Sequence, residues 1–175
     1  MHKNKSSFIN GVGDIPVIDL HFDESLIFCD LKAKDQEEVL KVMGNHLYEK
    51  NFVKESFIDA IIEREKTFPT GLPTSSNISV AIPHTDSVHV NKKAISLAIL
   101  KDAVEFGIMG EQEAKTPVKI VFLLAIDKQN SHLKILQKLI SIFQNEDVIK
   151  FLTTEKNKTL IKTKIIECLD LKEMN

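Results

Sequence analysis

Three basic side chains at separate places along the sequence could support the transfer of a charged group, and His84 is the most telling. It follows the apolar run 78–83, which is typical of a strand buried on both faces. Pro83 lacks an N–H and has a fixed φ, so it suits a strand end and favours a pre-set position for the next ring. Histidine can be neutral and nucleophilic, or charged, near pH 7. We therefore predict that His84 is a covalent catalytic residue.

His132 and Arg64 could complete such a site. His132 follows the apolar run 118–126 after a short polar stretch, and Arg64 precedes the loop that leads to His84. Sites in open α/β sheets form just outside the carboxyl ends of strands, so the two histidines could face one another there. Two imidazoles and a guanidinium suit phosphoryl transfer, which needs in-line positioning and stabilisation of oxygen charge.

Each of these residues also has an ordinary structural interpretation. A histidine at a strand end can be a turn or packing residue, and His132 can simply be exposed at the start of a helix. Arg64 can pair with Glu63 or Glu65 on a solvated helix face, where an ion pair contributes little. Spacing alone leaves these readings open.

A metal site is a further alternative. His84, Asp86 and His89 could be the ligands of a metal-dependent hydrolase, because imidazole and carboxylate suit zinc. The sequence has no cysteine near them and no helical His-Glu-x-x-His, so this spacing is only weakly diagnostic of a metal.

Periodicity predicts an α/β fold. We expect helices at 35–50, 54–65, 132–144 and 147–152 and a last one after 153 or 154, and strands at 26–29, 78–84, 94–100, 104–106 and 118–126. The stretch 68–77 is dense in turn formers and is expected to be a loop. Such interspersed elements predict a three-layer α/β/α sandwich with a mixed central sheet flanked by helices.

The apolar spacing of the C-terminal helices predicts which of their faces is buried. In the helix 132–144 the predicted buried residues are Leu133, Leu136, Ile140 and Phe143. In the last helix they are Leu160, Ile161, Ile165 and either Cys168 or Leu169.

Length and composition indicate one domain. With 175 residues, the chain is expected to form a flexible N-terminal arm at 1–14 and a single domain at 15–175. The net charge of −2 gives no bulk basic field for nucleic acid. The two cysteines, Cys29 and Cys168, are expected to be reduced and packed. Because neither a signal peptide nor a membrane span is visible, we expect a cytoplasmic protein without direct membrane insertion.

Three motifs, taken together, favour the catalytic interpretation of His84, His132 and Arg64. They are Glu-Arg-Glu-Lys at 63–66, Phe-Pro-Thr-Gly-Leu at 68–72 and Val-Ala-Ile-Pro-His at 80–84. From about 15 to 169 the chain resembles the fructose/mannitol (type 2) class of enzyme IIA domains of the bacterial phosphoenolpyruvate-dependent sugar phosphotransferase system (PTS). The stretches 68–72 and 83–89 look most like the galactitol-specific branch. Many members carry a glycine and a small residue where this chain has Asn77 and Thr85.

The resemblance implies a role for each candidate residue. His84 would accept a phosphoryl group from the phosphocarrier HPr and pass it to enzyme IIB, which is linked to the membrane enzyme IIC. His132, in Asn-Ser-His at 130–132, and Arg64 would steady the phosphoryl oxygens, with no metal or other cofactor. The protein would be a phosphotransferase in the uptake of a galactitol-like hexitol. A regulatory phosphoswitch of the same fold is the alternative.

Overall fold

The computed structural model describes residues 19–127 and 131–171, with the backbone alone for Ser131 and His132. Five strands form one sheet in the order β1-β4-β5-β3-β2. Pairs β1–β4 and β3–β5 are parallel, whereas β4–β5 and β2–β3 are antiparallel. The predicted mixed sheet is therefore confirmed. The strands are β1 Ile27–Leu31, β2 Gly71–Leu72, β3 Ser79–Ala81, β4 Ala94–Gly107 and β5 Lys115–Ala125.

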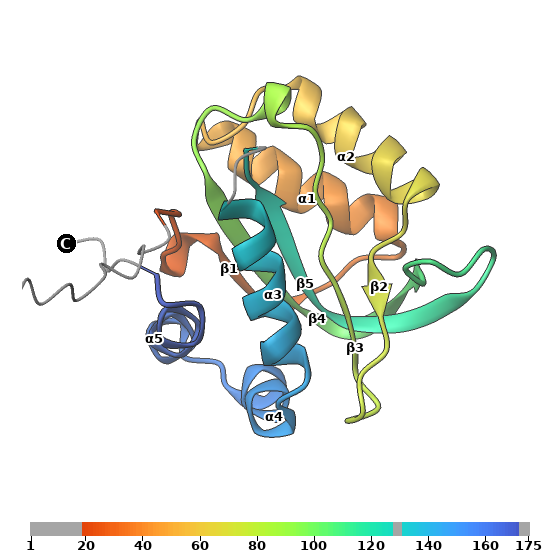
Figure 1. Ribbon diagram of the computed structural model, residues 1–175, viewed down its shortest axis with the longest axis vertical. Helices are drawn as coiled ribbons and strands as arrows, with labels where there is room; N and C mark the ends of the chain where they lie inside the picture. The colour runs from red at the N-terminus through yellow and green to blue at the C-terminus, as the bar shows by residue number, and fades with distance from the viewer. Residues whose placement is uncertain (1–18, 128–130, 172–175) are drawn as a thin grey trace, which may run out of the picture.

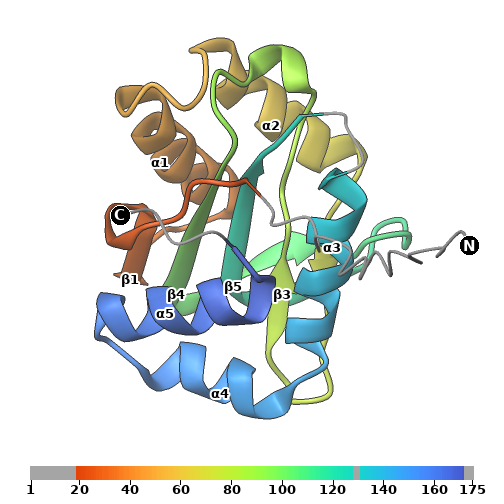
Figure 2. The same ribbon diagram turned by 60° about the vertical axis from the view of Figure 1, so that its left-hand side comes forward.

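Helices cover both faces of this sheet. Helices α1 and α2 lie on one face and α3, α4 and α5 on the other (Figures 1 and 2). This arrangement confirms the predicted three-layer α/β/α sandwich. The α-helices are α1 Gln36–Glu49, α2 Ser56–Thr67, α3 Ser131–Phe143, α4 Glu146–Thr154 and α5 Lys158–Leu169, with short 3-10 helices η1 Glu24–Leu26 and η2 Ser87–His89.

Side-chain caps fix where several helices begin. Asp35 accepts a hydrogen bond from the Glu38 amide at 2.9 Å and starts α1. Asn145 and Asn157 do the same for α4 and α5. Because Asn157 is the cap, α5 begins at Lys158, several residues later than predicted from the sequence.

The central strand β5 contributes to both cores of the sandwich. Ile120, Phe122 and Leu124 pack against the α3–α5 side, and Val121 and Leu123 pack against the α1–α2 side. Successive side chains of a strand point to opposite faces. Burial of both faces explains why this stretch is an uninterrupted apolar run.

Several predicted strands and helix ends need correction. The runs 94–100 and 104–106 form one strand, β4, with an irregularity between Ile99 and Val104. The predicted loop 68–77 contains β2, which pairs with β3. Regular pairing in β3 ends at Ala81, so His84 makes only an isolated bridge beyond it. Helix α2 continues to Thr67, beyond its predicted end.

The predicted buried faces of α3 and α5 are partly wrong. Of the predicted α3 set only Phe143 is fully buried, whereas Leu133 and Ile140 are exposed. Leu160 of α5 is exposed as well. Apolar residues occupy seven of the thirteen positions of α3 and form two interleaved stripes, so spacing alone could not select the buried one. The residues that α3 buries are Ile135, Leu139, Ile142 and Phe143.

Candidate functional site

His84 lies where β3 ends against the central strand β5. The Leu124 amide donates to the Pro83 carbonyl at 2.9 Å, and His84 forms a parallel bridge with Leu124. Pro83 has no N–H of its own, so the strand stops here. The His84 side chain is half-buried, which leaves part of the ring at the surface. The predicted position at a strand's carboxyl end is therefore confirmed.

A backbone carbonyl determines the orientation of the His84 ring. Nδ1 lies 2.8 Å from the carbonyl oxygen of Ile82. Because a carbonyl oxygen can only accept, Nδ1 must carry the proton in this hydrogen bond. In the neutral ring the lone pair then resides on Nε2. Nε2 is consequently the nitrogen of His84 that can act as a nucleophile.

Arg64 lies in the last turn of α2 and is partly buried. Its guanidinium carbon is 5.1 Å from the centre of the Phe68 ring, within cation–π range. Thr70, shortly after the end of α2, accepts a hydrogen bond from the Ile82 amide at 3.2 Å. That contact places the end of α2 next to the strand end that carries His84.

His132 is the second residue of α3, but its side chain lies outside the described part of the structure. The helix follows β5, the strand whose Leu124 pairs with His84. The approach of His132 to His84 is the prediction made from the sequence. Its role at the site stays a prediction.

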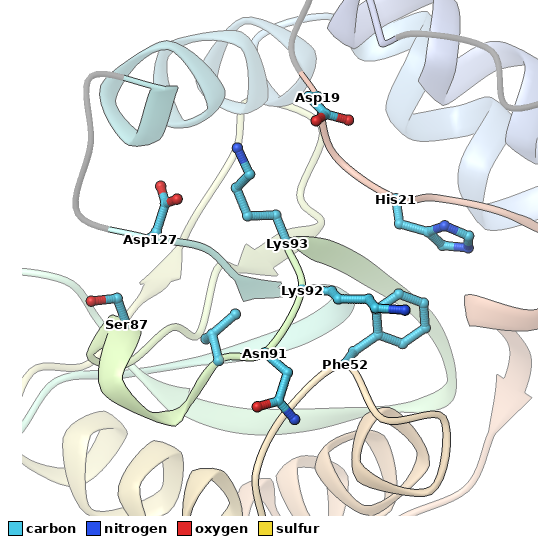
Figure 3. A pocket seen from close by; sticks show the side chains of 9 residues that line it. Asp19, His21, Phe52, Ser87, Asn91, Lys92, Lys93 and Asp127 are labelled. Atoms are coloured by element: carbon cyan, nitrogen blue, oxygen red, sulfur yellow. The ribbon is translucent and has the colours of Figure 1, made fainter.

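A hollow of about 590 Å³ lies at the carboxyl end of β5, and Figure 3 shows its lining. Ser87 and Asp127 line it, each three residues beyond a partner of the His84–Leu124 bridge. The Lys93 side chain also lines it. Within the described ranges, Asp127 Oδ1 is buried without a hydrogen-bond partner. The remaining lining residues are Asp19, His21, Phe52, Val90, Asn91 and Lys92.

Glu65 is a buried carboxyl that sequence reasoning missed. It is 2% exposed, and its carboxyl accepts hydrogen bonds from the Thr70 amide at 2.8 Å and the Thr70 hydroxyl at 2.9 and 3.1 Å. Burial raises the pKa of Glu65 to about 7, against the opposing effect of these bonds. Spacing could have found it, because Glu65 continues the buried series Phe57 and Ile61 at four-residue steps.

The metal alternative gains no geometric support. Across the side chains of residues 19–127 and 133–171, no three His, Cys, Asp or Glu residues gather closely enough to hold a metal ion. His89 Nδ1 instead lies 2.8 Å from the Ser56 hydroxyl of α2. The three proposed ligands, His84, Asp86 and His89, are therefore not brought together.

Two further sequence expectations can be compared with the structure. Cys29 and Cys168 are both partly buried and pack against the core, which agrees with the packing expected of them. In the described part of the chain, no helix has the length and apolar character needed to span a membrane. The predicted arm 1–14 lies outside the described residues.

Solved structures define the class of this fold as that of enzyme IIA domains. The complex of enzyme IIAMTL and phosphorylated enzyme IIBMTL from Escherichia coli matches with a TM-score of 0.65 at 23% identity, covering 86% of this chain and 98% of that chain. The chain belongs to the family "Phosphoenolpyruvate-dependent sugar phosphotransferase system, EIIA 2", which matches residues 20–167. It is a PTS EIIA component and therefore a phosphotransferase.

The relatives of this chain include proteins named for two different sugars, galactitol and mannitol. The PTS system galactitol-specific EIIA component of Escherichia coli K12 is 31% identical over 120 residues, which cover 69% of this chain and 79% of that protein. The PTS system mannitol-specific EIICBA component of Pasteurella multocida is 30% identical over 131 residues, which cover 74% of this chain but 20% of that much longer protein. Both similarities agree with membership of the EIIA family, but they name different sugars.

Proposed function

We propose that His84 is the phosphoacceptor of this EIIA component. Nε2 attacks the phosphorus of phosphorylated HPr, a new N–P bond forms, and the N–P bond of the donor histidine breaks. The donor imidazole leaves with the electron pair of that bond, and His84 later passes the phosphoryl group to enzyme IIB in the same way. The observation that carries this proposal is the 2.8 Å contact between His84 Nδ1 and Ile82, which leaves the lone pair on Nε2.

Charge around the attacking nitrogen would stabilise the transferred group. In this proposal Arg64 donates to the phosphoryl oxygens, because a planar guanidinium can reach two of them at once. His132, at the start of α3, steadies the same oxygens from the side of β5. Neither role requires a metal ion or a nucleotide.

Each of the three segments that carry the proposed site residues exposes one large apolar side chain. Phe68, Val88 and Leu133 are large apolar side chains exposed by 60%, 63% and 63%. They belong to the three segments that carry Arg64, His84 and His132. In this proposal these side chains contribute to the docking of HPr and of enzyme IIB, the partners between which His84 carries the phosphoryl group. In the cytoplasm, this enzyme IIB would serve a membrane enzyme IIC.

Galactitol, or a related hexitol, is the proposed transported sugar. The galactitol-specific relative supports this choice, since it resembles this chain over most of its own length. In a PTS the membrane component selects the sugar, so the specificity of this chain lies in the enzyme IIB that it recognises.

Phosphoryl transfer can be tested directly. The protein is incubated with phosphoenolpyruvate, enzyme I and HPr, and acid-labile phosphate is measured. Wild type and a matched His89→Ala variant should be labelled, whereas His84→Ala should not. Equal labelling of His84→Ala would refute the assignment of the phosphoacceptor.

A second step tests the proposed pathway. Labelled protein is mixed with purified galactitol-type and mannitol-type enzyme IIB, and label on each is followed. Faster transfer to the galactitol type supports the proposed sugar, and faster transfer to the mannitol type contradicts it. Label that stays on His84 with both would favour the regulatory phosphoswitch.

A further inference from the structure

The backbone just before His84 reaches a point where its sheet partner has ended. The pairing of β2 with β3 stops at Gly71 opposite Ala81. The next residue of the strand, Ile82, is only 2% exposed. Its amide would be costly to bury without an acceptor. The Thr70 hydroxyl oxygen accepts from this amide at 3.2 Å and so replaces the missing backbone carbonyl.

Glu65 determines how the Thr70 hydroxyl is used. A threonine hydroxyl has one proton to donate and lone pairs with which to accept. The carboxyl oxygens of Glu65 lie 2.9 and 3.1 Å from Thr70 Oγ1 and accept the hydrogen bond that this hydroxyl donates. The Thr70 amide donates to the same carboxyl at 2.8 Å. With its proton directed to Glu65, the hydroxyl presents a lone pair to Ile82.

The other side of Ile82 holds the ring of His84. The Ile82 carbonyl accepts from His84 Nδ1 at 2.8 Å. On the β5 side, the same segment is held by the Pro83 carbonyl and the Leu124 amide at 2.9 Å. On the β2 side, the corresponding hydrogen bond is the one from the Ile82 amide to the Thr70 hydroxyl. A continuous series of contacts therefore runs from the Glu65 carboxyl to the His84 ring.

We propose that Glu65 and Thr70 are positioning residues for phosphoryl transfer by His84. Through Ile82 they fix the carbonyl that orients the ring, so Nε2 meets the phosphorus in line. The inference rests on His84 being the phosphoacceptor. In this proposal neither residue touches the phosphoryl group, and both act through His84 alone.

Loss of the hydrogen bonds that link Glu65 and Thr70 to Ile82 should slow the chemical step more than it weakens the binding of phosphorylated HPr. Misplacement of a reacting group by about 1 Å can cost up to about 100-fold in rate. A backbone held on one side retains part of its order, so we expect Thr70→Val to lower kcat by about tenfold. KM for phosphorylated HPr should change by less than about twofold, because the docking surface is untouched.

The test compares apolar and conservative substitutions at both positions. Thr70→Val and Glu65→Met remove the contacts, whereas Thr70→Ser and Glu65→Gln keep an acceptor and donor of similar reach. The apolar variants should lose about tenfold in kcat, and the conservative ones should stay within about threefold of wild type. Thr67→Val is the matched control, since its exposed hydroxyl donates to the Glu63 carbonyl within α2.

Ring nitrogen-15 NMR of His84 supplies a readout that general destabilisation would not change. In wild type Nδ1 should be the protonated nitrogen, and in a folded apolar variant the proton should be shared between both nitrogens. A folded apolar variant with wild-type kcat would overturn the inference, as would a tenfold loss in Thr70→Ser. If wild type itself accepts no phosphate, the proposed function fails instead, so the two failures are distinguishable.

Discussion

Glu65 should make the stability of this fold fall as pH rises toward neutrality. The carboxyl lies on the buried face of α2, and burial raises its pKa from an ordinary value of 4.5 to about 7. Above pH 4.5 the folded protein therefore retains a proton that the unfolded chain releases. The unfolding free energy falls over the interval in which the folded state binds more protons. The contribution of Glu65 to stability is fully present below pH 4.5 and is lost as the pH rises through 7.

The size of this effect follows from the two pKa values. The gap between 4.5 and about 7 corresponds to about 3 kcal/mol at about 1.4 kcal/mol per pKa unit. Because Glu65 is almost fully buried, solvent screening does not reduce this figure appreciably. Such a loss is a large part of the roughly 5–15 kcal/mol that stabilises a typical domain.

Urea unfolding at pH 5 and pH 8 measures the effect when Glu65→Gln serves as the reference. Glutamine does not titrate, so the difference in unfolding free energy between wild type and variant should change by about 2–3 kcal/mol between the two pH values. Wild type should lose stability relative to the variant at pH 8. Glu63→Gln is the control, because Glu63 is exposed and lies two residues before Glu65 on α2. This control should show no such change.

Other charged groups lie near Glu65, and the reference variant retains all of them. Their contributions therefore cancel in the difference. A wild-type to Glu65→Gln difference that is the same at both pH values, within about 0.5 kcal/mol, would refute the raised pKa. The charged residues that share a hollow with Glu65 are Lys34, Asp35, Lys66, Glu105, Glu111, Glu113 and Lys115.

Two further predictions concern the site and its support. His132→Ala and Arg64→Ala should keep the wild-type melting temperature but slow phosphoryl exchange by about tenfold or more, since each removes a positioning group rather than the nucleophile; a normal rate would remove that residue from the site. Gly71→Ala should destabilise the fold by about 1–3 kcal/mol, because overpacking against backbone cannot easily relax. Its added Cβ would lie 2.5 Å from the Gly107 carbonyl oxygen, and an unchanged melting temperature would contradict this geometry.

The layers and most helices could be predicted because their signals are local. The run 118–126 is apolar because β5 is covered on both faces, and Asp35 is a cap that any helix start of this kind would use. The position of His84 after an apolar strand and a proline was also visible in the sequence. These features depend on residues close together along the chain.

The elements that were mispredicted depend on distant partners. Strand β2 lies in a Pro- and Gly-rich stretch and exists because Leu72 pairs with Val80. Strand β4 passes through the exposed residues 101–103, which look like a turn in the sequence, because β5 pairs on both sides of them. Asn77 has a φ of 59°, a left-handed conformation that favours glycine and that asparagine tolerates better than most residues.

Glu65 was missed because its sequence neighbours suggested the wrong partner. Next to Arg64, it looked like half of a surface ion pair. In the structure its carboxyl turns to Thr70, and only the four-residue spacing from Ile61 marks it as buried. Contacts of a side chain with a later loop cannot be read from charge order along a helix.

The charge of Glu65 and its capacity to accept hydrogen bonds are separable, which allows its two predicted effects to be distinguished. Glutamine removes the titration but keeps an oxygen that can accept from Thr70. Glu65→Gln should therefore abolish the pH-dependent loss of stability while phosphoryl transfer stays near the wild-type rate. Methionine removes both properties, so Glu65→Met should lose the pH dependence and the rate together. If Gln and Met slow transfer equally, the charge itself orients His84, and the hydrogen-bond explanation is wrong.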